Sequence, residues 1–165
     1  MPRVAIALGS NLGDRLANLM ASRDELKKIA SPGESSLEAS TYQTEPLLCP
    51  PGSPMFYNSV IEIAFDGTAT DLLAITQSIE RKLGRAAAPE RNAPRIIDID
   101  LLYFGDEVIA TDDLELPHPR IAQRRFVLQP LAEICPDRIL PGQTQSIAKL
   151  LHDLKTDEAP LIFVK

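Results

Sequence analysis

An alternation of apolar and acidic side chains with a period of two constrains the fold of this chain more than any other feature. The run reads Ile97, Asp98, Ile99, Asp100, Leu101. Because successive side chains of a strand point to opposite faces of a sheet, the two aspartates share one face and the apolar residues share the other. We therefore predict a half-buried strand at 95–104, with its apolar face packed under helices.

Apolar spacing elsewhere places further strands and helices before this one. Strands are predicted at 4–8, 36–43 and 56–65, and helices at 16–29 and 70–83. Thr70 is the candidate cap of the second helix, and Gly84 stands just past its end, where a C-cap glycine belongs. The resulting order, β-α-β-β-α-β, predicts an α+β fold of the ferredoxin-like type, with an antiparallel sheet and helices on one face.

The last third of the chain is expected to add elements to this core. The pattern predicts a short edge strand at 107–109, helices at 126–133 and 146–154, and a last strand at 161–164. A length of 165 residues with 44% apolar residues suits one domain, spanning 1–165.

Charge and cysteine usage exclude several classes of function. The formal net charge of -6 argues against nucleic-acid or anionic-membrane partners, and no run approaches the ~20 apolar residues of a membrane span. Cys49 and Cys135 form no zinc-binding pattern, and free thiols fit a reducing cytosol. We expect a cytoplasmic monomer that acts on small molecules.

The aspartate pair is the leading candidate for a metal site. Their Cα atoms lie ~7 Å apart along a strand, so the carboxylates can converge on magnesium, whose other ligands are commonly waters and phosphate oxygens. An amphipathic strand with a solvated acidic face is the alternative. Arg95, at the loop end of the same strand, favours a metal-phosphate site, because arginine donates paired hydrogen bonds to phosphate. Eight of the seventeen Lys and Arg residues lie between 81 and 125.

Other polar motifs leave their roles open. His118 lies between two prolines and is either structural or a ligand contact. The turn at 9–13 is expected to be a structural entry into the first helix, because it does not match a dinucleotide-binding glycine motif. The chain also has no G-x-x-x-x-G-K-[ST] phosphate loop, so ATP would be held by side chains and metal.

Several of these segments match one family. The run at 91–102, Arg-Asn-Ala-Pro-Arg-Ile-Ile-Asp-Ile-Asp-Leu-Leu, resembles the signature of 6-hydroxymethyl-7,8-dihydropterin pyrophosphokinases. The resemblance continues, in order, through residues 7–14, 42–46, 56–58, 77–80, 84–85, 117–120 and 124–131. It implies a magnesium-dependent enzyme of folate biosynthesis that moves the pyrophosphoryl group of ATP to the hydroxymethyl group of the pterin and releases AMP.

The resemblance also implies roles for individual residues. Asp98 and Asp100 would bind two magnesium ions, and Arg85 and Arg95 would neutralise the polyphosphate. The residues implied in ATP binding are Gln77, Glu80, Arg95, Leu101, His118 and Arg124. The residues implied in pterin binding are Thr44, Pro46, Leu47, Phe56, Asn58 and Phe126, with the pterin stacked between the two phenylalanines.

The loop at 86–93 departs from the family pattern. Ala87, Ala88 and Asn92 stand where many members carry arginine, lysine and tryptophan. Two other functions remain open on sequence alone. One is a different metal-dependent phosphoryl or nucleotidyl transferase, which would release a product other than AMP. The other is a non-catalytic ferredoxin-like binding module, which would need neither the aspartates nor the arginines.

Overall fold

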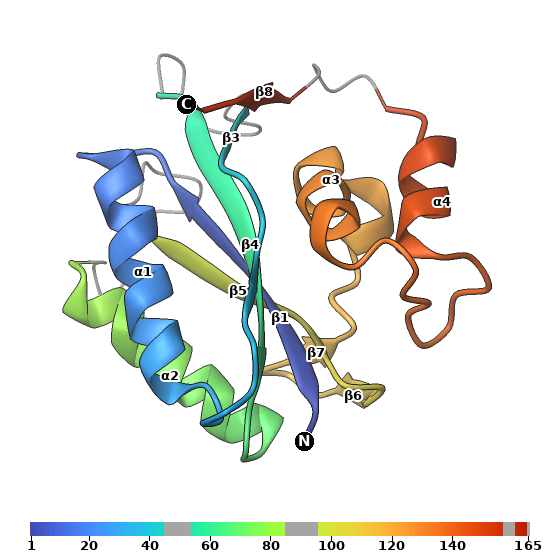
Figure 1. The fold of residues 1–165 in the computed structure, drawn as a ribbon, viewed down its shortest axis with the longest axis horizontal. Helices are drawn as coiled ribbons and strands as arrows, with labels where there is room; N and C mark the ends of the chain where they lie inside the picture. The colour runs from blue at the N-terminus through green and yellow to red at the C-terminus, as the bar shows by residue number, and fades with distance from the viewer. Residues whose placement is uncertain (45–53, 85–95, 157–160, 165) are drawn as a thin grey trace.

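The computed structural model describes residues 1–44, 54–84, 96–156 and 161–164 of one α+β fold (Figure 1). The strands of its main sheet are β1 (Arg3–Ser10), β2 (Leu37–Glu38), β3 (Tyr42–Thr44), β4 (Phe56–Ala64), β5 (Asp98–Phe104) and β8 (Ile162–Phe163). The strand order is β5-β1-β4-β3-β8, with β2 paired to β4, and every described pairing is antiparallel. The predicted antiparallel sheet is confirmed.

Helices cover both faces of this sheet. Figure 1 shows α1 (Arg15–Ile29) and α2 (Ala69–Lys82) on one side, and α3 (Arg125–Ile134) and α4 (Ile147–Asp153) on the other. One buried cluster lies under the first pair and includes Leu19, Leu72 and Ile97. A second cluster lies under the other pair and includes Val60 and Leu128. The prediction of helices on one face, made for the β-α-β-β-α-β core, is confirmed for α1 and α2, and the added helices α3 and α4 cover the other face.

Local sequence signals explain where the first two helices begin and end. Asp14 caps α1 by accepting a hydrogen bond from the Ala17 amide at 3.1 Å, and Gly13 before it has φ +73°. A turn into the first helix is thus confirmed, but it lies at 12–14, because residues 9 and 10 still belong to β1 (Arg3–Ser10). Thr68, not the predicted Thr70, caps α2, because it forms a reciprocal capping box with Asp71. Gly84 follows the end of α2 with φ +107°, as expected of a C-cap glycine.

The shorter strands differ most from the sequence prediction. The expected strand at 36–43 is broken into β2 and β3. The strand expected at 107–109 is β6 (Ile109–Ala110), which pairs with β7 (Glu115–Leu116) in a separate two-stranded sheet. A 3-10 turn, η1 (Ile121–Gln123), leads into α3. Within the described residues, none of the helices combines the length and apolar character needed to cross a membrane.

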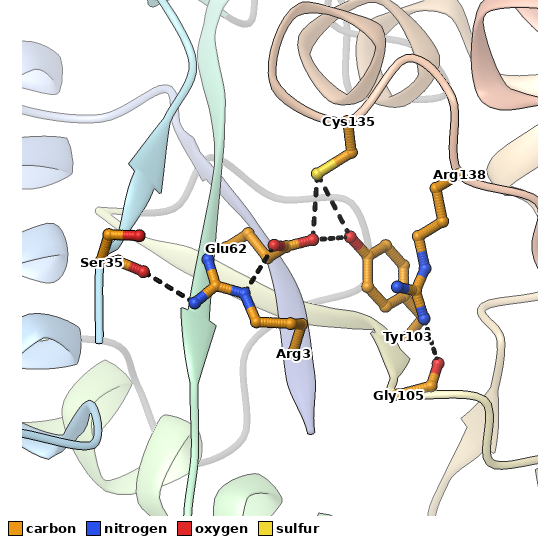
Figure 2. A network of polar contacts seen from close by, with 7 residues as sticks. All are labelled: Arg3, Ser35, Glu62, Tyr103, Gly105, Cys135 and Arg138. Atoms are coloured by element: carbon orange, nitrogen blue, oxygen red, sulfur yellow. Dashed lines mark hydrogen bonds and ion pairs between the residues drawn. The ribbon is translucent and has the colours of Figure 1, made fainter. Parts of the chain in front are cut away.

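A polar network joins the end of α3 to the centre of the sheet (Figure 2). Glu62 of β4 is 5% exposed and accepts hydrogen bonds from the Tyr103 hydroxyl, from Cys135 Sγ at 3.0 Å and from Arg3 Nε at 2.9 Å. The Arg138 guanidinium lies 4.0 Å from the centre of the Tyr103 ring. Burial of Glu62 favours a higher pKa, but these three donors outweigh burial, so its pKa lies below the ordinary value.

Cys135 is part of this network and is a free cysteine. Burial, together with the neighbouring Glu62 carboxylate, raises the pKa of its thiol to about 11. A thiol that stays protonated at neutral pH is a poor nucleophile, so Cys135 serves packing and hydrogen bonding here.

Candidate active site

The two aspartates of β5 lie on one face of the sheet, as predicted. Asp98 pairs with Gly9 and Asp100 pairs with Ala7 across the β1–β5 ladder. Asp98 is half-buried and Asp100 is exposed. The residues that alternate with them are core residues, and their exposed fractions are 0% for Ile97, 5% for Ile99 and 4% for Leu101. The carboxylates therefore face the side of the sheet that carries α3, away from α1 and α2.

The sheet register places Asp98 in a row with residues of three other strands. Gly9 of β1 pairs with Asp98 on one side and with Asn58 of β4 on the other, and Asn58 pairs with Tyr42 of β3. Directly paired residues point to the same face, and neighbouring strands lie about 4.8 Å apart. Asp98 and Asn58 are therefore about 10 Å apart at Cα, separated by a residue without a side chain.

Gly9 is a site residue that sequence reasoning missed. It lies inside β1, not in the turn where it was expected. A Cβ atom at this position would lie 3.0 Å from Asn58 Oδ1 and 3.6 Å from the nearest atom of the Phe56 ring. The absence of a side chain at Gly9 thus lets the Asn58 amide and the Phe56 ring lie close against the backbone of β1. A glycine inside an apolar strand is itself a signal of close approach, and that signal could have identified it.

Three of the predicted pterin-binding residues meet at the ends of β3 and β4. Asn58 is 8% exposed and donates from Nδ2 to Thr44 Oγ1 at 2.5 Å, while Phe56 pairs with Thr44 and is half-buried. Because Phe56 and Asn58 are two positions apart, both lie on the face that carries α3. Pro46 and Leu47 lie outside the described residues.

Phe126 and Arg124 stand at the start of α3, on the same side of the sheet. Phe126 is half-buried and packs against the second apolar cluster. The Arg124 guanidinium carbon lies 5.4 Å from the centre of the Phe126 ring, a favourable distance for a cation over an aromatic face. The fold thus presents one aromatic ring from the sheet and another from the helix to the same half of the molecule.

Glu80 supports the strand that carries the aspartates. Its side chain is on α2 and is 7% exposed, and Oε2 accepts a hydrogen bond from the Ile99 amide at 2.9 Å. Ile99 lies between the two aspartates, so this bond holds the backbone from which both carboxylates project. Gln77, one helical turn earlier, is exposed. The Leu101 side chain is buried among core residues, so a nucleotide could contact only its backbone.

His118 lies beside β5 and is held in its neutral form. Its amide donates to the Leu102 carbonyl at 2.7 Å, and its Nδ1 accepts from the Arg120 amide at 3.2 Å. Burial lowers its pKa below the ordinary value, and the positive charges of Arg124 and Arg120 lower it further, against the opposing effect of Glu115. A neutral ring with Nδ1 as acceptor leaves Nε2–H as a donor.

The donor set fits a cation that also binds phosphate. No group of three or more histidine, cysteine or acidic side chains suited to a metal gathers among the residues that the structure describes. Magnesium in nucleotide enzymes usually takes one or two carboxylates, with water and phosphate oxygens as the other ligands, so an accessible pair is sufficient. Arg85 and Arg95, predicted to contact the polyphosphate, lie outside the described residues.

Comparisons with known proteins point to one family. The family model for 7,8-dihydro-6-hydroxymethylpterin-pyrophosphokinase (HPPK) matches residues 5–136. A 2-amino-4-hydroxy-6-hydroxymethyldihydropteridine pyrophosphokinase of Methylorubrum extorquens is 37% identical, over 91% of this chain and 94% of the relative. The enzyme of the same name from Bacillus subtilis is 42% identical, over 79% of this chain and 76% of the relative. Folic acid synthesis protein FOL1 of Dictyostelium discoideum is 39% identical over 84% of this chain, which spans only 20% of that protein.

Solved structures share the fold. The wild-type HPPK-DHPS of Plasmodium falciparum, solved with SDX-DHP, superposes with a TM-score of 0.71 at 13% identity, covering 92% of this chain and 44% of that one. At such low identity the likeness concerns the fold alone. The family model, by contrast, matches most of the chain, including the strand that carries both aspartates. The chain therefore belongs to the 7,8-dihydro-6-hydroxymethylpterin-pyrophosphokinase family.

Proposed function

We propose that this chain transfers the pyrophosphoryl group of ATP to 6-hydroxymethyl-7,8-dihydropterin, giving AMP and the pterin diphosphate, as a step of folate biosynthesis. Its family and the names of its full-length relatives support the proposal. The structural observation that carries it is the row formed by Asp98, Gly9 and Asn58. That row sets the acidic pair and the amide proposed to bind the pterin edge on the same face of the sheet.

Asp98 and Asp100 are the proposed ligands of two magnesium ions. Magnesium bound there would supply neutralisation of phosphate charge and a lowered pKa for the attacking hydroxyl group. Glu80 keeps the intervening Ile99 amide bonded, so the two carboxylates project from a fixed stretch of backbone. This pre-organisation is what charge stabilisation during transfer requires.

The proposed pterin slot lies between the sheet and α3. Phe56 and Phe126 would stack on the two sides of the flat ring, since aromatic faces bind heterocycles well. Asn58 would read the ring edge, and its bond to Thr44 Oγ1 fixes the orientation of the amide. The backbone at Thr44, Pro46 and Leu47 is proposed to complete this edge.

The ATP side of the site is proposed to use the remaining predicted residues. Gln77, Glu80, the Leu101 backbone, His118 and Arg124 would hold the nucleotide, and Arg85 and Arg95 would neutralise its phosphates. His118 supports this role with a neutral ring whose Nε2–H is available to donate. Arginine is suited to it because its planar fork donates two parallel hydrogen bonds.

The proposed reaction is a single in-line displacement. The hydroxymethyl oxygen forms a bond to the β-phosphorus, the bond from that phosphorus to the bridging α,β-oxygen breaks, and AMP leaves with the bridging oxygen. The hydroxyl proton passes to solvent. No enzyme nucleophile takes part, so catalysis depends on positioning and charge stabilisation.

The finer structural and cellular expectations belong to the same proposal. The order β5-β1-β4-β3, with two crossing helices on one face, supports the ferredoxin-like description of the core. We also propose that the chain acts as a cytoplasmic monomer on small molecules, without nucleic-acid or membrane partners. Size-exclusion chromatography with light scattering tests the monomer.

The function is tested by product analysis. The chain is incubated with ATP, magnesium and the reduced hydroxymethylpterin, and nucleotides are separated by anion-exchange chromatography. AMP formed in step with the pterin diphosphate supports the proposal, whereas ADP or no product overturns it. Asp98→Asn and Asp100→Asn are expected to lose turnover at least ~100-fold while staying folded, as is typical when transition-state charge stabilisation is removed. Asp66→Asn, the same change in the exposed loop before α2, is the matched control.

A further inference from the structure

One carboxylate of α3 gathers three hydrogen bonds from the segment that contains β3. Glu133 Oε2 accepts from the Ser40 amide at 2.8 Å and from the Ser40 hydroxyl at 2.9 Å, and Oε1 accepts from the Tyr42 hydroxyl at 2.6 Å. Ser40, Tyr42 and Glu133 together form what we call the clamp. Hydrogen bonds to a charged group are stronger than neutral ones, so the clamp is a firm tie between helix and strand.

The strand end of the clamp lies beside the proposed pterin slot. Tyr42 is 2% exposed, pairs with Asn58 across the β3–β4 ladder, and lies two positions before Thr44 on the same face. The residue thus adjoins both members of the Asn58–Thr44 hydrogen bond. Burial raises the pKa of Tyr42, as does the bond to Glu133, so the hydroxyl remains a donor at any physiological pH.

The helix end of the clamp lies on the same helix as Phe126. Glu133 follows Phe126 by seven residues, nearly two full turns, so both side chains project from the same face of α3 about 10 Å apart. Fixing Glu133 against β3 therefore fixes where Phe126 lies over the sheet. Phe56, the opposite wall of the slot, belongs to β4, the strand to which β3 is paired.

We infer that Ser40, Tyr42 and Glu133 are positioning residues for the pterin, because their clamp ties the sheet wall of the slot to the helix wall and so sets the distance between Phe56 and Phe126. This inference rests on the proposed function. A flat ring stacks on two faces only when the gap matches its thickness, and a misplacement of about 1 Å can cost large factors in binding or rate.

The second network of α3 provides a matched control. Tyr103 also donates its hydroxyl to a carboxylate, Glu62, next to the end of the same helix, as Figure 2 shows. Glu62 lies four residues beyond Asn58 on β4, about 13 Å further along the strand. Loss of either tyrosine hydroxyl removes a hydrogen bond to a carboxylate, and Tyr103 also loses its contact with Cys135, but only Tyr42 adjoins the slot.

The test compares Tyr42→Phe with Tyr103→Phe. Thermal unfolding gives the stability of each variant. Calorimetric titration with 6-hydroxymethylpterin, in the presence of magnesium and a non-hydrolysable ATP analogue, gives the pterin Kd, and a separate titration gives the Kd of the analogue. Both variants are expected to melt at lower temperature. Only Tyr42→Phe is expected to raise the pterin Kd, by about three- to tenfold, with the analogue Kd within about twofold of the wild-type value.

Two further variants keep the inference falsifiable if Tyr42→Phe does not fold. Glu133 is exposed, so its substitution leaves no buried cavity. Glu133→Gln retains one acceptor oxygen and is expected to raise the pterin Kd less than Glu133→Ala. A pterin Kd unchanged in every clamp variant that folds, or raised equally by Tyr103→Phe, overturns the inference and leaves the proposed function intact. A wild-type chain that does not bind the pterin overturns both.

Discussion

Substitution of Gly9 by alanine tests directly whether the close approach of the Asn58 side chain to the backbone of β1 matters. The added methyl group would lie 3.0 Å from Asn58 Oδ1, which is closer than ordinary carbon–oxygen contact. Asn58 cannot easily retreat, because it is 8% exposed and bonded to Thr44 at 2.5 Å. The amide must therefore move by a few tenths of an ångström, and its hydrogen bond must distort.

Two opposing effects determine the size of the change in stability. Overpacking at a tight position typically costs about 1–3 kcal/mol, while replacing glycine by alanine in permitted backbone gains about 0.4–1 kcal/mol from the unfolded state. We expect Gly9→Ala to lower the free energy of unfolding by about 1 kcal/mol. The pterin Kd is expected to rise at least about tenfold, because the displaced amide is the group proposed to read the ring edge.

A double-mutant cycle isolates the contact. Free energies of unfolding are measured in urea for the wild type, Gly9→Ala, Asn58→Ala and the double variant, and pterin affinity is measured by calorimetry for the first two. Without the Asn58 amide the new methyl group meets no oxygen, so the cost of Gly9→Ala should fall to zero or become a small gain. An equal cost in both backgrounds, or an unchanged pterin Kd in the single variant, would refute the reasoning.

Three further predictions follow from individual contacts. Glu80→Leu should expose the Ile99 amide to hydrogen exchange and raise the magnesium concentration needed for half-maximal activity. Glu80→Gln keeps an acceptor oxygen, so its exchange rate and magnesium requirement should stay close to those of the wild type. Equal changes in the two variants would point to a role for the charge itself. The pKa of His118 lies below its ordinary value of 6.5, so the stability that the neutral ring contributes is present above about pH 6.5 and is lost as pH falls toward the folded pKa. In His118→Gln, the free energy of unfolding measured in urea should therefore depend less on pH between about pH 7 and 5. A pH dependence equal to that of the wild type would contradict this. Thr68→Ala should lower the free energy of unfolding by about 1 kcal/mol, because it removes the capping box with Asp71, while Thr70→Ala should change it very little. A larger loss in Thr70→Ala than in Thr68→Ala would instead support Thr70 as the helix cap.

Sequence reasoning succeeded where the signal is periodic. The faces of β5 could be predicted because alternation over five residues allows only one assignment of Asp98 and Asp100 in a half-buried strand. Helix ends were less certain, since Thr68 and Thr70 are both plausible caps and only the reciprocal bond with Asp71 distinguishes them. Periodicity within one element also does not say which face of the sheet that element covers, so the position of α3 could not be predicted.

Relations between strands could not be predicted in the same way. The contact of Gly9 with Asn58 depends on the β1–β4 register, which joins residues 49 positions apart. The bond from the Ile99 amide to Glu80 depends on how α2 packs along β5, and nothing in the local sequence distinguishes Glu80 from an exposed helical glutamate. The resemblance implied an ATP contact for Glu80, whereas the structure adds a contact with the backbone between the aspartates.

The register also bears on the alternative that the acidic face of β5 is only solvated surface. Repulsion between two carboxylates ~7 Å apart in water is about 0.6 kcal/mol, so energy alone does not argue against an idle pair. A purely solvated face, however, does not require a glycine beside Asp98. It also does not require the buried Asn58 amide on β4, whose Nδ2 lies 2.5 Å from Thr44 Oγ1. Gly9 and Asn58 both carry a cost, because glycine weakens a strand and a buried amide must be satisfied. Their occurrence in one row with Asp98 therefore favours a binding site over an amphipathic strand.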